Sequence, residues 1–276
     1  MNILVTNDDG IGSEGLRVLA ESLTHLGDVT VMAPDREHSG SGMAVGPLLG
    51  VVSRVQRASL GALDDVWTID GTPALGVMFA LRGLFDKSFD LVVSGINPGA
   101  NCGPNIYFSG TVGAAVVARN LGVSGVAVSQ MTSFQEVHGQ GKANGQQWTS
   151  AATVATGIVE GLIAHPPETA CALNVNVPNK AFDQIRGIRL AEVARNSGRD
   201  GARAILKESS EGADTYSAHY ESGRAVPSHG QFDDAIVKSD SVSLSILGFL
   251  DHHEPASFTD LVDRIVTASS HLKFSK

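Results

Sequence analysis

The sequence predicts an α/β fold in which a Rossmann-like parallel or mixed sheet is flanked by helices. Short apolar segments rich in strand-forming residues alternate with helical patterns over residues 1–130. Several of these segments end in polar or glycine-rich residues, as expected where parallel strands reach the edge of a sheet. Between about residues 183 and 250 the pattern changes to strand-like pieces with polar connections. We therefore expect one α/β domain over residues 1–276, with an antiparallel extension at 183–250 that contributes to a subunit contact.

The individual elements follow from the spacing of apolar residues and from the residues that begin or end each segment. The expected strands are residues 2–6, 28–33, 67–70, 89–94, 125–129 and 172–177. The expected helices are residues 16–23, 72–84, 113–121 and 148–164. Residues 132–147 and 196–234 are polar and predict exposed segments. The apolar spacing near the C-terminus predicts a final amphipathic helix that carries Phe258, Leu261, Val262, Ile265 and Val266.

Charge and composition exclude several classes of protein. The net charge of −9 argues against a broad surface for DNA or RNA, although a metal ion can still attract a small phosphorylated substrate. The longest apolar runs fall short of the roughly 18 residues that span a bilayer, so we expect no membrane partner. The chain enters a strand pattern without a basic leader, and we expect a cytoplasmic protein. Cys102 and Cys171 are expected to be reduced thiols.

Two adjacent aspartates, Asp8 and Asp9, follow the first expected strand. Like charges this close raise one pKa or require a cation between them. Mg²⁺ and Mn²⁺ bind carboxylate, hydroxyl, amide and water oxygens. The pair therefore indicates a divalent metal site, and the alternative is that one aspartate only caps the helix that follows.

Two further polar loops follow expected strands, and a parallel sheet would bring them to the same edge. Ser39 lies in a Gly/Ser-rich segment that otherwise predicts a flexible turn. Its glycines do not form a dinucleotide fingerprint, because no strand runs directly into them and no clear helix follows. His38, beside Ser39, is a candidate proton donor or acceptor. Asn97 lies in a loop whose glycines permit close approach of a ligand.

A third segment, Ser109, Gly110 and Thr111, precedes an expected helix. Hydroxyl groups and backbone N–H groups at a helix N-terminus form a natural phosphate site. The same residues equally fit an ordinary Ser/Thr cap. Other chemistries have little support, since the sequence contains no Walker A loop, HExxH or GxSxG motif and no Cys/His zinc spacing. His252 and His253 are expected to be solvated.

Five motifs in fixed order resemble the SurE family, stationary-phase survival proteins that are 5′/3′-nucleotidases. They are ILVTNDDG at 3–10, APDREHSGSG at 33–42, DGTP at 70–73, SGINPGANCG at 94–103 and FSGTVGAA at 108–115. The resemblance implies a Rossmann-like domain whose C-terminal part exchanges between subunits, and hence a homodimer or homotetramer. It also implies one Mg²⁺ or Mn²⁺ per subunit, with ligands at Asp8, Asp9, Ser39 and Asn97.

This resemblance implies a phosphoric monoester hydrolase that depends on a metal ion. Its expected substrates are nucleoside 5′-monophosphates, and 3′-monophosphates are a second candidate. Asp8, Asp9 and Asn97 would be catalytic, and Asn97 would bind the phosphate together with residues 109–111. One alternative is a haloacid-dehalogenase-type phosphatase, which needs carboxylates two residues apart, where this chain has Gly10. The other alternative is a nucleotide-binding sensor without turnover. It stays open because the chain departs from the family pattern around Ala74 and Ser245.

Overall fold

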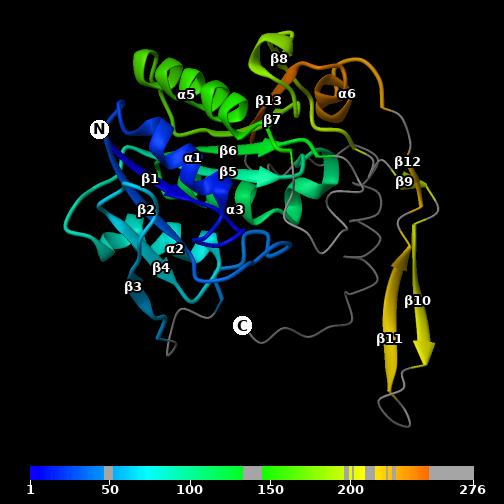
Figure 1. Cartoon of the computed structure of the whole chain (residues 1–276), viewed down its shortest axis with the longest axis horizontal. Helices are drawn as coiled ribbons and strands as arrows, with labels where there is room; N and C mark the ends of the chain where they lie inside the picture. Colours follow the sequence, from blue (N-terminus) through cyan, green and yellow to red (C-terminus); the bar gives the residue numbers. More distant parts are fainter. Residues whose placement is uncertain are drawn as a thin grey trace, which may run out of the picture.

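A computed structural model describes residues 1–46, 52–132, 145–195, 199–200, 202–208, 215–221, 223–225 and 228–248 (Figure 1). Its main feature is a nine-stranded sheet with the order β3-β4-β2-β1-β5-β6-β7-β13-β8. These strands are β1 Asn2–Thr6, β2 Asp28–Pro34, β3 Val55–Arg57, β4 Val66–Ile69, β5 Leu91–Pro98, β6 Ser124–Gln130, β7 Ala172–Val177, β8 Ile188–Leu190 and β13 Val242–Leu247. The expected α/β class is confirmed.

The six central strands, from β4 to β7, run parallel. Strand β3 pairs antiparallel with β4 and β13 antiparallel with β7, whereas the edge strand β8 pairs parallel with β13. Because side chains alternate across a strand, a central strand can contribute to a core on each face of the sheet. In β1, Ile3 and Val5 belong to one buried cluster and Leu4 to the other. The sheet is therefore covered on both faces, and most residues of its central strands are buried and apolar.

Helices supply both covering layers. They are α1 Glu14–Leu23, α2 Pro73–Phe79, α3 Gly110–Asn120, α5 Trp148–Ala164 and α6 Asp233–Lys238. The core on one face contains the apolar sides of α1 and α5, and the core on the other face contains those of α2 and α3. Within the described parts of the chain, no helix is long and apolar enough to cross a membrane.

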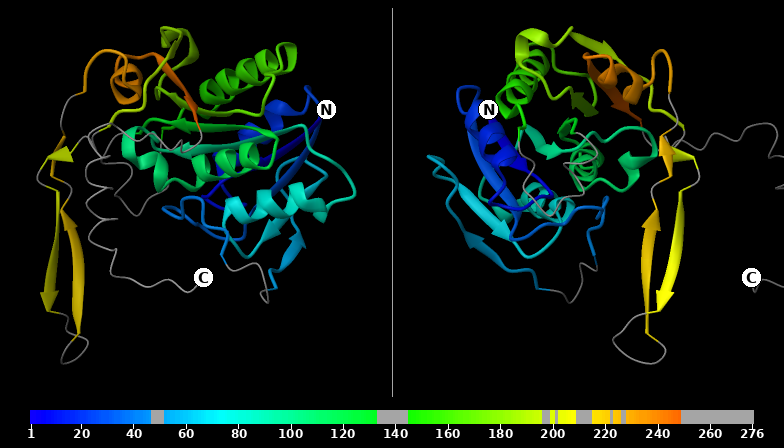
Figure 2. Two further views of the ribbon diagram at one scale, coloured as in Figure 1. Left: turned by 180° about the vertical axis from the view of Figure 1, so that it is seen from behind. Right: turned by 45° about the vertical axis from the view of Figure 1, so that its right-hand side comes forward.

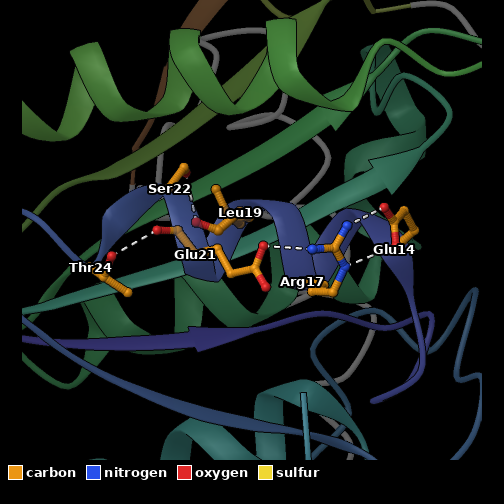
Figure 3. Close-up of polar contacts among 6 residues, drawn as sticks. All are labelled: Glu14, Arg17, Leu19, Glu21, Ser22 and Thr24. Atoms are coloured by element: carbon orange, nitrogen blue, oxygen red, sulfur yellow. Dashed lines mark hydrogen bonds and ion pairs between the residues drawn. The ribbon is translucent and has the colours of Figure 1, made fainter. Parts of the chain in front are cut away.

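The polar outer face of α1 carries a small network of charged side chains (Figure 3). Arg17 donates hydrogen bonds to Glu14, with the shortest at 2.5 Å, and to Glu21 at 2.6 Å. The opposite face contributes Leu16, Leu19 and Leu23, all fully buried, to the core. This division matches the apolar spacing that predicts the helix.

Two of the sequence predictions differ from the structure. The helix expected over residues 72–84 ends as α2 at Phe79 and continues as a π-helical turn, Ala80–Leu84, in which Gly83 has φ +94°. The region expected to be strand-like and polar contains α6, which the sequence patterns did not predict. Helix α6 is only six residues long, and so short an element offers little periodicity to detect. The expected C-terminal helix and His252–His253 lie outside the described residues.

The expected antiparallel extension is present as two small sheets. Strands β10 Arg203–Glu208 and β11 Tyr216–Glu221 form one, and β9 Arg199–Asp200 and β12 Arg224–Ala225 form the other. The β10–β11 hairpin projects away from the α/β body in every view (Figures 1 and 2). Its face made by Ala204, Leu206, Tyr216, Ala218 and Tyr220 is apolar and exposed.

Candidate active site

The polar segments that follow β1, β2 and β5 meet at one edge of the sheet, because β1 pairs with both of the other strands in parallel. The last residue of β1, Thr6, pairs with Ser94 of β5. The turn after β1 contacts the loop after β2 directly, since the backbone N–H of His38 donates to the carbonyl oxygen of Asp8 at 2.7 Å. The sheet order therefore places the candidate residues as expected for ligand binding beyond the carboxyl ends of parallel strands.

Asp8 is 3% exposed and lies against the N-terminus of α3. The hydroxyl of Thr111 donates to Asp8 Oδ1 at 2.5 Å, and the backbone N–H of Gly110 donates to Oδ2 at 3.1 Å. Burial raises the pKa of Asp8 above its ordinary value, although the hydrogen bonds from Thr111 and Gly110 oppose this shift. The positive end of the helix dipole also favours the carboxylate form.

Asp9 has fewer compensating contacts than Asp8. Burial, followed by the charges of Asp8 and Glu37, raises the pKa of Asp9 to about 8. Its Oδ2 atom is buried and has no hydrogen-bond partner among the described residues. A carboxylate in this position is poorly stabilised by the protein alone.

Ser39 and Glu37 lie next to each other in the loop after β2. The Ser39 hydroxyl donates to Glu37 Oε1 at 2.8 Å, and this pair is exposed to solvent. The charge of Glu37 also reaches Asp9. Motif spacing singled out Ser39 but gave no role to Glu37, because a carboxylate two residues before a serine has no distinctive local pattern.

Asn97 lies near the end of β5, on the strand beside β1. Its side-chain Nδ2 donates to the carbonyl oxygen of Gly99 at 2.7 Å, which leaves the amide oxygen as the group able to bind a cation. Among the described residues, no side-chain hydrogen bond joins Asn97 to Asp8, Asp9 or Ser39. The structure thus brings Asn97 to the same edge of the sheet without connecting it directly to the aspartates.

The groups expected to bind phosphate at the start of α3 already have partners. Ser109 is the N-cap, and its hydroxyl oxygen accepts from the backbone N–H of Val112 at 3.1 Å. Gly110 and Thr111 donate to Asp8. Residues 109–111 therefore adopt the cap geometry and also fix the position of Asp8, while their role in phosphate binding stays a prediction.

Several buried polar atoms at this edge have no partner within the described parts of the chain. They are Thr6 Oγ1, Asn7 Oδ1, Asp9 Oδ2, His38 Nε2, Ser41 Oγ and Ser94 Oγ. Most are hard oxygen atoms, as Mg²⁺ and Mn²⁺ prefer. No three His, Cys, Asp or Glu side chains gather as a metal site in the described residues, so a cation here would also need hydroxyl or amide oxygens. Because these groups are mostly oxygen atoms, the residues at this edge fit a hard divalent cation.

A buried polar network, which the sequence analysis missed, holds the loop between Asn97 and α3. The Asn101 backbone N–H donates to Asn176 Oδ1 at 2.7 Å, and the Asn174 side chain donates to the Asn101 carbonyl oxygen at 2.8 Å. Further along the loop, the Gly103 backbone N–H donates to Asp233 Oδ2 at 2.9 Å. The alternating asparagines within the otherwise apolar strand at 172–177 were the available sequence signal.

Comparison with known proteins gives consistent similarities. The family model described as survival protein SurE matches residues 3–200. The protein named 5′-nucleotidase SurE of Legionella pneumophila (strain Lens) is 39% identical over 209 residues, 75% of each chain. The one of Aeromonas hydrophila is 39% identical over 208 residues, 75% of this chain and 76% of the relative. The crystal structure of the SurE protein from Aquifex aeolicus is 30% identical, with a TM-score of 0.76, and the match covers 96% of this chain and 99% of that one.

Proposed function

Because the chain belongs to the SurE family, we propose that it hydrolyses nucleoside monophosphates at the edge of the sheet formed by β1, β2 and β5. Its relatives in Legionella pneumophila and Aeromonas hydrophila are named 5′-nucleotidase SurE. The chain is accordingly a 5′-nucleotidase, which is a hydrolase of phosphoric monoesters. The reaction is placed here because a buried oxygen of Asp9, which has no hydrogen-bond partner among the described residues, lies beside the buried carboxylate of Asp8. Two carboxylates in this arrangement need a positive charge, which a metal ion would provide.

The proposed cofactor is one Mg²⁺ or Mn²⁺ per subunit, with Asp8, Asp9, Ser39 and Asn97 as its ligands. When bound, such an ion polarises a phosphate oxygen and lowers the pKa of a coordinated water. Thr111 and Gly110 hold the Asp8 carboxylate in one orientation. The Asn97 contact with Gly99 leaves its amide oxygen available. These contacts support a site that is arranged before the substrate arrives.

The substrate phosphate would lie between Asn97 and the start of α3. Because the side chains of Ser109 and Thr111 already cap the helix and hold Asp8, their contribution is to shape this part of the site rather than to supply new hydrogen bonds. His38, whose buried Nε2 has no partner among the described residues, is a candidate to protonate the departing oxygen of the nucleoside.

The assembly we propose is a homodimer or homotetramer of a cytoplasmic protein. The exposed apolar face of the β10–β11 hairpin supports it, because a two-stranded sheet is at best marginally stable when it stands alone in water. Pairing with a second copy would cover that face.

The test is phosphate release from a panel of nucleoside monophosphates, with Mg²⁺ or Mn²⁺ and then with a chelator. We expect release that the chelator abolishes. Asp8→Asn or Asp9→Asn should lower kcat by at least about 100-fold, since each removes a charge that holds the cation. Asp64→Asn, at an exposed aspartate outside the site, is the matched control and should leave the rate unchanged. A rate near that of the wild type in either site variant would contradict the assignment.

The same panel separates the two alternatives. Tight nucleotide binding without phosphate release would indicate a sensor. A trapped phosphoenzyme would indicate the haloacid-dehalogenase mechanism.

A further inference from the structure

The start of α3 has little remaining capacity to bind an anion. The Gly110 N–H and the Thr111 hydroxyl are directed to Asp8, and the Val112 N–H is directed to the Ser109 hydroxyl. The next N–H, from Gly113, donates to the Ser109 carbonyl oxygen at 2.9 Å. A phosphate that approaches this helix therefore needs a hydrogen-bond donor from elsewhere in the site.

Ser41 supplies a hydroxyl group at that position. A Cβ atom placed on Gly110 would lie 2.9 Å from Ser41 Oγ and also 2.9 Å from Asp8 Oδ2, so the hydroxyl faces the first residue of α3 beside the Asp8 carboxylate. Ser41 Oγ is buried and has no hydrogen-bond partner among the described residues. A buried hydroxyl without a partner is destabilising, and because Ser41 Oγ lies beside Asp8, a phosphate bound at this site would supply the missing acceptor.

The backbone around Ser41 is held firmly in place. The Ser41 N–H donates to the His38 carbonyl oxygen at 3.1 Å, and the Gly42 N–H donates to the Phe108 carbonyl oxygen at 3.0 Å. Gly42 has φ +55°, and a Cβ atom there would lie 2.7 Å from the Tyr107 carbonyl oxygen. Only glycine permits this close approach, so the loop is fixed against the segment that leads into α3.

The two serines of this loop differ in their surroundings. The Ser39 hydroxyl is exposed and donates to Glu37, whereas the Ser41 hydroxyl is buried beside Asp8. We propose that Ser41 binds the substrate, by donating a hydrogen bond to a non-bridging oxygen of the phosphate. This inference rests on the proposed phosphatase activity and adds a phosphate-binding residue to the same site.

The experiment compares Ser41→Ala with the wild-type protein. Its first measurement is calorimetric binding of inorganic phosphate in the presence of Mn²⁺, and its second is kcat/KM for a nucleoside monophosphate. We expect both to fall by about 10- to 100-fold, as for the loss of one hydrogen bond to a charged group. Mn²⁺ affinity measured without phosphate should stay the same, and the melting temperature should not decrease, because the hydroxyl has no hydrogen-bond partner within the described part of the chain.

Ser245→Ala is the matched control, since Ser245 Oγ on β13 is also buried and lacks a hydrogen-bond partner in the residues that the structure describes, but it lies outside the site. It should leave phosphate binding and kcat/KM unchanged. Unchanged phosphate affinity in Ser41→Ala would overturn the proposal, and so would a parallel loss of Mn²⁺ binding, which would make Ser41 a metal or scaffold residue. If the wild-type protein bound phosphate and Mn²⁺ but released no phosphate from any nucleotide, the proposed activity would fail while the binding comparison still tested Ser41.

Discussion

Asp8 and Asp9 are neighbours in the sequence, yet their surroundings differ. Both oxygens of Asp8 accept hydrogen bonds from the start of α3, whereas Asp9 keeps a buried oxygen without a partner among the described residues. Burial raises both pKa values, and Asp9 additionally experiences the charges of Asp8 and Glu37. Asp8 is therefore fixed in position by the protein, while Asp9 depends more on an added positive charge.

At the residue scale, Gly110→Ala should impair the site. A Cβ atom at Gly110 would lie 2.8 Å from Asp8 Cβ and 2.9 Å from Ser41 Oγ, so Asp8 or the loop after β2 has to move. We expect kcat/KM to fall by at least about 10-fold, because small displacements of catalytic groups are costly. Gly157→Ala in α5 is the control, since a Cβ atom there has open space within 4 Å. Equal activity in the two variants would show that the site tolerates the displacement.

Helix α1 shows which kind of side-chain contact stabilises a single element. In α1, Leu19 is fully buried in the core, whereas Arg17 forms ion pairs with Glu14 and Glu21 on the outer face (Figure 3). Buried apolar area stabilises a fold far more than exposed ion pairs do. The packing of α1 on the sheet is thus determined mainly by its apolar side.

At the element scale, we predict different costs for two substitutions in α1. Leu19→Ala should lower the free energy of unfolding by about 2–5 kcal/mol, because it leaves a cavity in the core. Arg17→Ala should lower it by less than about 1 kcal/mol. Urea denaturation followed by circular dichroism measures both values. An Arg17→Ala cost as large as that of Leu19→Ala would show that the charged network matters more than its exposure indicates.

At the scale of the whole molecule, the α/β body and the β10–β11 hairpin differ in how their apolar surfaces are covered. The body covers both faces of its sheet with its own helices. The hairpin projects from the body (Figure 2). The side chains of its apolar face are exposed. Asp233 at the start of α6 accepts hydrogen bonds from Gly103 and Ala194, so the loop near the site is connected to the segment that leads into the extension.

We predict that the apolar face of the hairpin holds the subunits together. The double substitution Leu206→Ser and Tyr220→Ser should shift the protein to monomer in sedimentation velocity, since these exposed side chains share that face. The control is Lys207→Ser with His219→Ser, on the opposite face of the same hairpin. Retention of the oligomer by the first variant, or its loss in both, would exclude this face as the contact.

Much of the fold could be predicted from the sequence, because the strands and helices of the body have clear apolar periods. Residues 2–6, 148–164 and 172–177 have the same bounds in the structure as in the prediction. The candidate metal ligands follow from motifs at predicted strand ends, and their role as ligands stays a prediction. Short α6 and the π-helical turn after α2 were missed, since neither has a local signal strong enough to distinguish it.

The sequence by itself determined the α/β class, the family and the candidate ligands, because these depend on local periodicity and on motifs that are contiguous in the chain. Only the tertiary structure decided which hydrogen-bond partners the residues of the candidate site have. It directs Thr111 and Gly110 to Asp8 and joins Asn101 to Asn176. It also buries the Ser41 hydroxyl where none of the described residues is its hydrogen-bond partner. These contacts join residues far apart in sequence, and hydrogen-bond partners between such residues are fixed only when the strands pair and the helices pack.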